Sequence, residues 1–224
     1  MNRALYTLIL HLALPIIFLR LLWRAWRAPA YGRRIGERFA VGLPAFRQGG
    51  IWIHAVSLGE SIAAAPLILE LLERHPELPI TVTCMTPTGS ERIQALFGAR
   101  IQHCYLPYDL PWACARFLDR LQPKLAVIME TELWPNHIHA CHRRGIPVAL
   151  ANARLSERSA RGYARFAGLT RPMLAQMTFH QGCAALVTGD CLPVRKPDPA
   201  PLLRACSSWR KPSARPASWR PTSA

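Results

Sequence analysis

Acidic residues are scarce in this chain: 13 Asp and Glu stand against 28 Lys and Arg, which gives a formal net charge of +15. The seven cysteines include no C-x-x-C pair, so neither a zinc site nor a disulfide framework is indicated, and a reducing compartment suits them best. Neither a G-x-G-x-x-G fingerprint nor a G-x-x-x-x-G-K-[ST] loop occurs, which disfavours a classical dinucleotide or P-loop site. Half of the residues are hydrophobic, so the chain is able to form a packed core.

The positive charge lies at the two ends of the chain. Residues 1–50 carry eight Arg against Glu37 alone (+7), residues 178–224 carry +5, and residues 51–177 carry only +3. A nucleic-acid-binding protein more often displays its charge as a stripe on the folded domain. We therefore expect no nucleic-acid partner and interpret the N-terminal charge as facing anionic lipid.

The N-terminus contains an apolar run, residues 4–19, without a formal charge. Basic and aromatic residues follow it at near-helical spacing: Arg20, Trp23, Arg24, Trp26 and Arg27. Such a flank is typical of the membrane interface and predicts that this side stays cytoplasmic. The run is short for a full span of about 20 residues, and no small-residue cleavage site follows it. We expect residues 1–28 to form a membrane anchor, either a signal anchor or a deeply seated interfacial helix, with a buried core helix as the alternative.

The middle of the chain alternates short apolar runs with segments of helical periodicity. The expected strands are residues 51–56, 80–84, 101–106, 125–129 and 147–151, and the expected helices are residues 61–73, 91–98, 112–121, 133–144 and 156–166. This alternation predicts an α/β fold with a parallel sheet and helices on both faces. Ligands bind such folds at the carboxyl ends of the strands. The segments expected at that edge are residues 57–60, 86–90, 130–132 and 152–154.

Two roles are open for Glu60. Ser57 and Glu60 form an S-x-x-E capping box, in which both side chains satisfy N–H groups at the start of a helix. Gly59 lets the backbone turn tightly at the ligand edge of the sheet, which favours a catalytic role for Glu60. A capping glutamate and a catalytic glutamate do not exclude each other.

Glu130 ends an apolar strand, and Glu132 opens the helix behind it. One interpretation is that both carboxylates simply favour a helix N-terminus electrostatically. The other places Glu130 in the same cleft as Glu60, where two carboxylates with Arg154 nearby suit proton abstraction from a hydroxyl.

The histidines do not indicate a metal site. His54 lies inside a strand and is expected to be a core or supporting residue. His137, His139 and His142 occupy positions i, i+2 and i+5 of a helix, so they do not converge on one face. We expect no metal and no cofactor.

Six collinear stretches carry a resemblance to a known family: RAPAYGRRIGER (27–38), IWIHAVSLGE (51–60), TVTCMTPTGSER (81–92), YLPYDLP (105–111), METELWPN (129–136) and ANARLSERSARGY (151–163). The chain resembles the 3-deoxy-D-manno-octulosonic acid (Kdo) transferases of Gram-negative lipopolysaccharide synthesis. The likeness covers about residues 1–177 and includes the N-terminal anchor.

The resemblance implies a GT-B fold, in which two Rossmann-like domains enclose a cleft. It implies inverting, metal-independent transfer of Kdo from CMP-Kdo to a lipid A precursor (lipid IVA) at the cytoplasmic side of the inner membrane. Glu60 matches the family's general base, and Glu130 matches a glutamate that assists the transition state. The expected substrate-binding residues are Ser57, Gly59, Ser90 and Arg154.

The resemblance stops after Met177. Residues 178–224 hold seven Pro and are rich in Arg, and we expect a disordered tail that arose by frameshift or truncation, with a natural basic tail as the alternative. Residues 29–177 would then be the N-terminal, acceptor-binding domain, and the second GT-B domain would be missing. We expect such a chain to be inactive alone; the alternative function is a non-catalytic, membrane-tethered fragment that binds the acceptor lipid.

Overall fold

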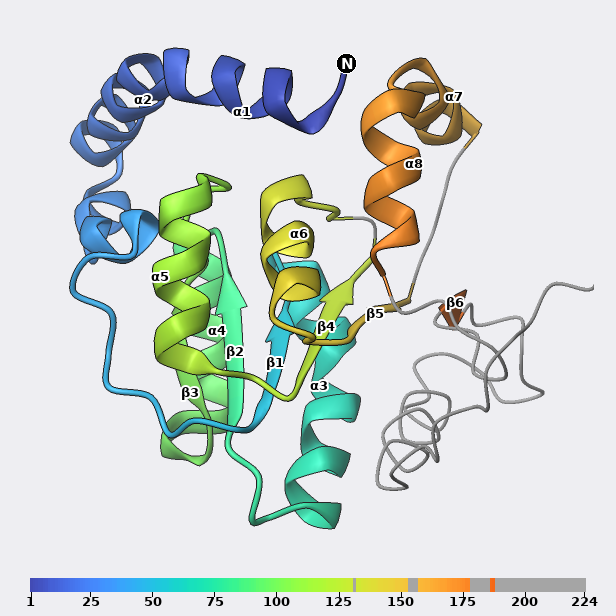
Figure 1. The fold of residues 1–224 in the computed structure, drawn as a ribbon. Helices are drawn as coiled ribbons and strands as arrows, with labels where there is room; N and C mark the ends of the chain where they lie inside the picture. Colours follow the sequence, from blue (N-terminus) through green and yellow to red (C-terminus); the bar gives the residue numbers. More distant parts are fainter. Residues whose placement is uncertain (131, 153–156, 178–185, 188–224) are drawn as a thin grey trace, which may run out of the picture.

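A computed structural model describes residues 1–130, 132–152, 157–177 and 186–187 (Figure 1). Two expectations concern other parts of the chain. Arg154 lies outside the described residues, and so does the tail 178–224 except for its two residues 186–187.

The core is a parallel sheet with the strand order β3-β2-β1-β4-β5-β6. The strands are β1 (Ile51–His54), β2 (Ile80–Cys84), β3 (Gln102–Tyr105), β4 (Leu125–Met129), β5 (Val148–Ala151) and β6 (Leu186–Val187). The five strands expected from the sequence are therefore confirmed, and their order is that of a doubly wound sheet. The chain moves outward from β1 to β3 and then returns to the other side of β1 with β4, so the order reverses between β1 and β4.

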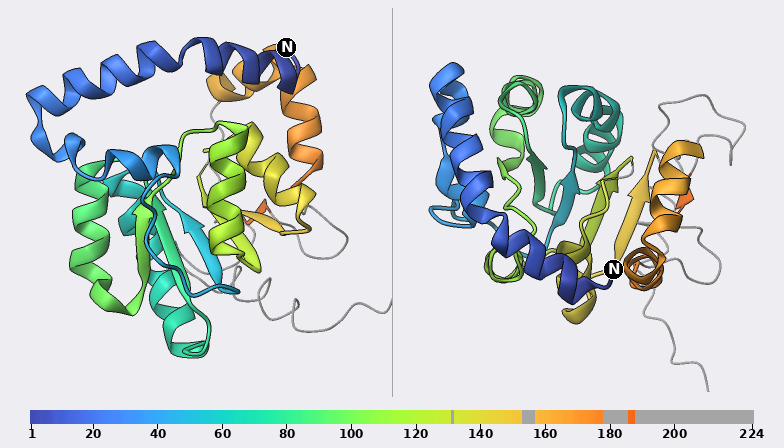
Figure 2. Two further views of the ribbon diagram at one scale, coloured as in Figure 1. Left: turned by 60° about the vertical axis from the view of Figure 1, so that its left-hand side comes forward. Right: turned by 90° about the horizontal axis from the view of Figure 1, so that it is seen from above.

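Helices cover both faces of the sheet, as expected (Figures 1 and 2). They are α3 (Leu58–Arg74), α4 (Pro87–Phe97), α5 (Pro111–Leu121), α6 (Pro135–Arg143), α7 (Glu157–Arg165) and α8 (Ala167–Ala175). Short 3-10 turns occur at Pro29–Gly32, Ile35–Phe39 and Gly98–Arg100. Successive strand residues point to opposite faces: Trp52 belongs to the core that contains Phe117 of α5, whereas Ile53 belongs to the core that contains Ile68 of α3.

Two helices start at a proline rather than where the periodicity placed them. α4 begins at Pro87, four residues before the expected start, because Thr86 caps it by accepting a hydrogen bond from the backbone N–H of Gly89 at 3.1 Å. α6 begins at Pro135, two residues later than expected, after an extended Trp134. Proline suits the first helical turn, where its missing N–H costs nothing.

The N-terminal segment forms two helices, α1 (Arg3–Leu12) and α2 (Leu14–Arg27), which are bent by 52° relative to each other. The break arises because Pro15, in the first turn of α2, lacks the N–H that a continuous helix would bond to the carbonyl of His11. The segment expected to form an anchor is therefore divided into two helices, and its role as a membrane anchor stays a prediction. Among the described residues, no single helix is long and apolar enough to cross a membrane. By length and composition alone, the bent pair of α1 and α2 would be sufficient.

α1 is fixed to the edge of the domain toward which the strands point (Figure 1). Tyr6 donates a hydrogen bond from its hydroxyl to Asp109 Oδ2 at 3.0 Å, and both Arg3 and Thr7 donate to Asn136 Oδ1, at 3.2 and 3.1 Å. The helix pair also exposes large apolar side chains: Leu8, Leu12, Ile16, Leu19, Trp23 and Trp26. One face of α1 is thus held by the domain while apolar groups of both helices are left in contact with solvent.

Candidate active site

The expected carboxylates meet where β1 and β4 lie side by side, at the reversal of strand order. Glu60 follows β1 on α3, and Glu130 directly follows β4. Glu130 raises the pKa of Glu60 through electrostatic repulsion, and both carboxylates act in the same way on Glu132. The structure therefore brings Glu60 and Glu130 close enough at the carboxyl edge to influence each other, and Glu132 joins them as a third carboxylate.

Glu60 forms the capping box that its spacing from Ser57 predicts. The Ser57 hydroxyl oxygen accepts a hydrogen bond from the Glu60 backbone N–H at 3.4 Å and donates its proton to Glu60 Oε1 at 2.9 Å. Glu60 Oε2 accepts from the Val56 backbone N–H at 2.8 Å. Each oxygen keeps a lone pair beyond these bonds, so the capped carboxylate is still able to accept a proton.

The environment of Glu60 raises its pKa above the ordinary value of 4.5. Burial is the largest cause, since the residue is only 7% exposed. The hydrogen bonds from Val56 and Ser57 act in the opposite direction because they stabilise the ionised form, and the charge of Glu130 adds to the increase. A carboxylate with a raised pKa at a ligand edge is a candidate general base.

Gly59 does not make the tight turn that the sequence predicts. It lies in the first turn of α3 without a positive φ angle, and a Cβ at this position would come no closer than 3.9 Å to another side chain. The change of direction occurs at Ser57, whose extended backbone (φ −118°, ψ 173°) precedes the helix. Glycine is therefore not required here for backbone reasons.

Glu130 adopts a left-handed backbone conformation with φ of +57°. Asn152, the residue that follows the neighbouring strand β5, does the same with φ of +53°. A non-glycine residue in this region costs about 1–3 kcal/mol, and such residues cluster at functional sites. The Glu130 backbone N–H donates to the carbonyl of Ala151 at 2.7 Å, which holds the strained turn in place.

Glu132 lies in the loop before α6 rather than opening the helix, because α6 begins only at Pro135. The expectation that Glu132 opens the helix is therefore wrong. Burial is the largest cause of the raised pKa of Glu132, and the charges of Glu60 and Glu130 raise this pKa further.

Ser90 is buried (3% exposed) and already has two partners. Arg34 Nη2 donates to its hydroxyl oxygen at 2.5 Å, and the hydroxyl donates to His103 Nε2 at 2.8 Å. The proton assignment follows because His103 Nδ1 lies 2.8 Å from the Val82 carbonyl and must donate to it. Ser90 is thus placed to orient Arg34, and the expected direct contact with substrate stays a prediction.

Arg34, the partner of Ser90, is a residue that the sequence reasoning did not single out. It has a left-handed backbone (φ +55°), its guanidinium carbon lies 4.3 Å from the centre of the Tyr105 ring, and its Nη1 lies 3.5 Å from Glu37. The motif GRRIGER contains it, but nothing in the local pattern indicates that a 3-10 turn brings it to α4.

His54 is a buried core residue, as expected. Its Nδ1 lies 2.9 Å from the Thr83 hydroxyl, and burial lowers its pKa to about 4. His137 is buried as well, whereas His139 is partly exposed and His142 exposed, which agrees with the prediction that these three do not share one face.

A cavity of about 470 Å³ opens beside Glu132, between α1, the loop before α6, α7 and α8. Its lining includes Tyr6, Glu132, Trp134, Phe166 and Met173 and is mostly apolar. Within the described part of the chain, the buried indole N–H of Trp134 has no hydrogen-bond partner. The volume lies in the range of small-molecule pockets, about 300–1,000 Å³.

Comparison with known proteins finds relatives that are described as Kdo transferases. A Kdo transferase of Haemophilus influenzae is 44% identical over 180 residues, which cover 80% of this chain and 42% of that protein. One of Bordetella pertussis is 43% identical over 174 residues, 72% of this chain and 39% of that protein. A probable mitochondrial Kdo transferase of Arabidopsis thaliana is 42% identical over 65% of this chain and 33% of its own length. The chain thus spans about two fifths of the length of its bacterial relatives.

Among solved structures, UDP-GlcNAc 2-epimerase from Neisseria meningitidis aligns with a TM-score of 0.42 and 16% identity over 58% of this chain and 40% of that one, a likeness too distant to support an argument. A family model described as 3-deoxy-D-manno-octulosonic-acid transferase (kdotransferase) matches residues 33–182, more than half of the chain. These residues include Arg34, Glu60, Glu130 and Glu132. The chain therefore belongs to the Kdo transferase family.

Proposed function

We propose that this chain is the acceptor-binding half of an inverting glycosyltransferase that moves Kdo from CMP-Kdo to a lipid A precursor in lipopolysaccharide core synthesis. The observation that carries the proposal is the Glu60–Glu130 pair at the reversal of strand order, inside the region that matches the family. Because the chain spans about two fifths of its relatives, the donor site and the second GT-B domain are assigned to the remaining part of such proteins.

Glu60 acts as the general base in this proposal. Its carboxylate takes the proton of an acceptor hydroxyl as the oxygen attacks the anomeric carbon of Kdo, and CMP leaves with the electron pair of the broken bond. The raised pKa improves the base, since proton abstraction is most efficient when the pKa approaches the working pH. The bonds from Val56 and Ser57 fix the carboxylate in one orientation.

Glu130 and Glu132 supply negative charge on the other side of the same edge. An oxocarbenium-like centre that develops positive charge during transfer is stabilised by nearby carboxylates. The strained turn at Glu130 is consistent with this role, because it presents the side chain directly at the end of β4.

In this proposal the site works at the cytoplasmic face of the inner membrane, and the exposed side chains of the N-terminal helices support that location. Leu12, Ile16 and Trp26 are 71%, 69% and 79% exposed, and burying such side chains in lipid is favourable by about 1.5–3 kcal/mol each. The basic residues of α2 suit anionic headgroups. The apolar cavity next to Glu132 would receive a hydrophobic part of the lipid acceptor.

The test is transfer of labelled Kdo from CMP-Kdo, generated in situ, to lipid IVA in detergent or vesicles. It compares the chain itself with a chimera in which the part after residue 177 is replaced by the corresponding remainder of the Haemophilus influenzae relative. Product from the chimera supports the assignment. A folded chimera that binds lipid IVA but gives no product would overturn the enzymatic role.

A second function, a membrane-tethered module that binds acceptor lipid without catalysis, is favoured by the exposed apolar helices and the cavity. It predicts that the chain alone binds lipid IVA in vesicles, and that Glu60→Gln leaves this binding unchanged. Turnover by the chimera distinguishes the two functions, because only the enzymatic one predicts Kdo transfer.

A further inference from the structure

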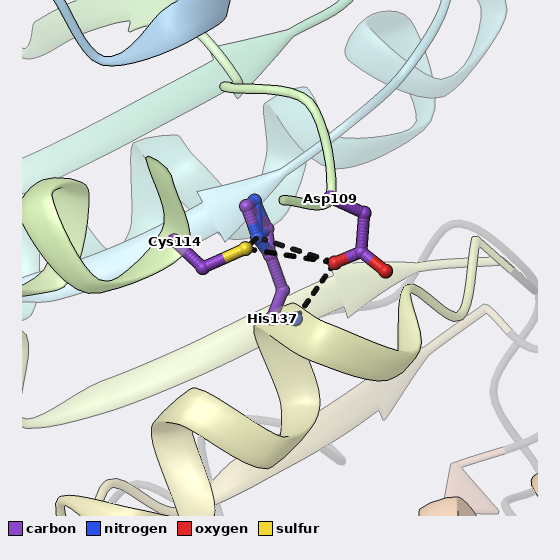
Figure 3. A group of neighbouring side chains, drawn as sticks. All are labelled: Asp109, Cys114 and His137. Carbon is purple, nitrogen blue, oxygen red and sulfur yellow. Dashed lines mark hydrogen bonds and ion pairs between the residues drawn. The ribbon is translucent and has the colours of Figure 1, made fainter. Parts of the chain in front are cut away.

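A second group of reactive side chains lies inside the domain, where α1 is attached to it. Asp109 precedes α5, Cys114 lies on α5 and His137 on α6, and their side chains point toward one another (Figure 3). The three residues are 2%, 0% and 2% exposed. Such burial excludes a nucleophilic Cys–His–Asp triad, because no substrate could reach the thiol.

The proton on His137 is placed by its surroundings. His137 Nε2 lies 3.1 Å from the carbonyl oxygen of Pro107 and donates its proton there. The lone pair of Nδ1 therefore faces Cys114 Sγ at 3.1 Å and Asp109 Oδ1 at 3.8 Å. Histidines that bind metals through one ring nitrogen usually donate the other N–H to a carbonyl or carboxylate, as His137 does.

Hydrogen bonds also fix the orientation of Asp109. Its Oδ2 accepts hydrogen bonds from the Tyr6 hydroxyl and the Asn136 backbone N–H, both at 3.0 Å. Oδ1 accepts from the His137 backbone N–H at 2.8 Å and lies 3.6 Å from Cys114 Sγ. Both carboxylate oxygens are thus held in place by backbone N–H groups of α6, and Oδ1 also faces the thiol and the imidazole.

The three separations suit a bound ion. A point equidistant from Cys114 Sγ, His137 Nδ1 and Asp109 Oδ1 lies about 2.0 Å from each atom, given their distances of 3.1, 3.6 and 3.8 Å. Zinc bonds to nitrogen and oxygen are about 2.0–2.2 Å long and those to sulfur about 2.3 Å, so a small displacement from the plane of the three atoms satisfies all of them. We propose that Asp109, Cys114 and His137 bind a structural divalent metal ion, for which Zn²⁺ is the best match.

The charges balance at such a site. Zn²⁺ with the Cys114 thiolate, the Asp109 carboxylate and a neutral His137 is electrically neutral. Burying the complete site in a low-dielectric interior therefore costs less free energy than burying an unpaired charge. Binding releases the thiol proton to solvent, and the metal–sulfur bond replaces the S–H bond. The three side chains supply three of the four ligands that a tetrahedral zinc site takes.

Without an ion, burial works against every charged form in the group. It raises the pKa of the Cys114 thiol and raises the pKa of Asp109 to about 6, and it lowers the pKa of His137 to about 3. The ion would tie α5 to α6 and, through Tyr6 and Asp109, would stiffen the attachment of α1. The proposal does not depend on Kdo transfer.

The experiment measures metal content and stability of the full chain purified without chelator. We expect about one zinc per chain by mass spectrometry and, after refolding with Co²⁺, a thiolate-to-cobalt charge-transfer band. Cys114→Ser and His137→Leu should lose both signals. Cys104→Ser, which removes another buried thiol, outside the group, should keep both.

A chelator should lower the thermal midpoint of the wild-type chain and of Cys104→Ser by several degrees, and added Zn²⁺ should restore it. It should leave Cys114→Ser unchanged. The proposal is overturned if the folded wild-type chain holds no more metal than Cys114→Ser and shows neither a cobalt band nor a response to the chelator. The residues would then form a hydrogen-bonded group only.

Discussion

Glu60 and Val56 are joined by a 2.8 Å hydrogen bond from the Val56 backbone N–H to Glu60 Oε2. This bond makes the glutamate part of the helix cap and at the same time fixes its orientation at the end of β1. A base that is held in place before the substrate arrives has no orientation to lose during the reaction. Capping and catalysis therefore cooperate in this residue.

Glu60→Gln should separate the two roles. The amide keeps a carbonyl oxygen for the cap but is not able to accept a proton, so Kdo transfer by the chimera should fall about 10²–10⁴-fold. Glu73→Gln, the same change on the exposed face of α3, is the matched control, because it leaves both the cap and the Glu60 carboxylate in place. Turnover rates and urea unfolding of both variants decide the matter. Near-normal turnover by a folded Glu60→Gln chimera would leave only the capping role.

Glu132→Gln should stabilise the chain at neutral pH. The native environment raises the pKa of Glu132, through burial and then the charges of Glu60 and Glu130. A raised native pKa means that the native state binds the proton more tightly, so the stabilisation is present below pH 4.5 and is lost as the pH rises through the native pKa. Glutamine carries no charge and avoids this loss.

Urea unfolding at pH 7 and pH 4 measures the effect. Glu132→Gln should be more stable than the wild type at pH 7, and the difference should shrink at pH 4. Glu73→Gln, on the exposed face of α3, should show no comparable pH dependence. An equal difference at both pH values would show that the charge of Glu132 is not the cause.

The sequence predicts well whatever depends on neighbours along the chain. The five central strands follow from short apolar runs, and the cap of α3 follows from Ser57 and Glu60, three residues apart. The placement of Glu60 and Glu130 at one edge follows from the rule that parallel strands share their carboxyl ends. Periodicity does not indicate the proline starts of α4 and α6, which depend on the geometry of the first helical turn.

Other features required tertiary structure. The left-handed turn at Glu130 contains no glycine that would predict it from the sequence. The hydrogen bond between Arg34 and Ser90 joins residues that are 56 positions apart. The contact between Cys114 and His137 joins residues 23 positions apart on different helices. A search for histidine spacing on one helix does not find such a group.

Thr83→Val should lower the free energy of unfolding strongly, although the two side chains are nearly equal in size. The Thr83 hydroxyl accepts from Trp52 Nε1 at 2.8 Å and forms a hydrogen bond of 2.9 Å with His54 Nδ1. Valine keeps the shape but leaves both buried groups unpaired, at about 1–3 kcal/mol for each. Thr81→Val is the control on the same strand, because its partner Gln102 keeps a second hydrogen bond to the main chain. Equal unfolding free energies for the two variants would contradict this account.

The membrane role of the N-terminal helices needs a test that leaves α1 attached. Removing residues 1–28 would also remove the bond between Tyr6 and Asp109, so a loss of binding would have two explanations. A point substitution on the exposed face avoids this problem.

Leu12→Glu should weaken binding to vesicles that contain anionic lipid by about tenfold or more, since inserting a leucine side chain is favourable by about 1.5–3 kcal/mol. Leu12 is 71% exposed at the end of α1 and makes none of the hydrogen bonds that hold this helix to the domain. Leu69→Glu is the matched control, because Leu69 is 40% exposed on α3, away from the N-terminal helices. Cosedimentation at low and high salt measures both variants, and equal binding by Leu12→Glu and Leu69→Glu would show that the exposed face of α1 does not enter the membrane.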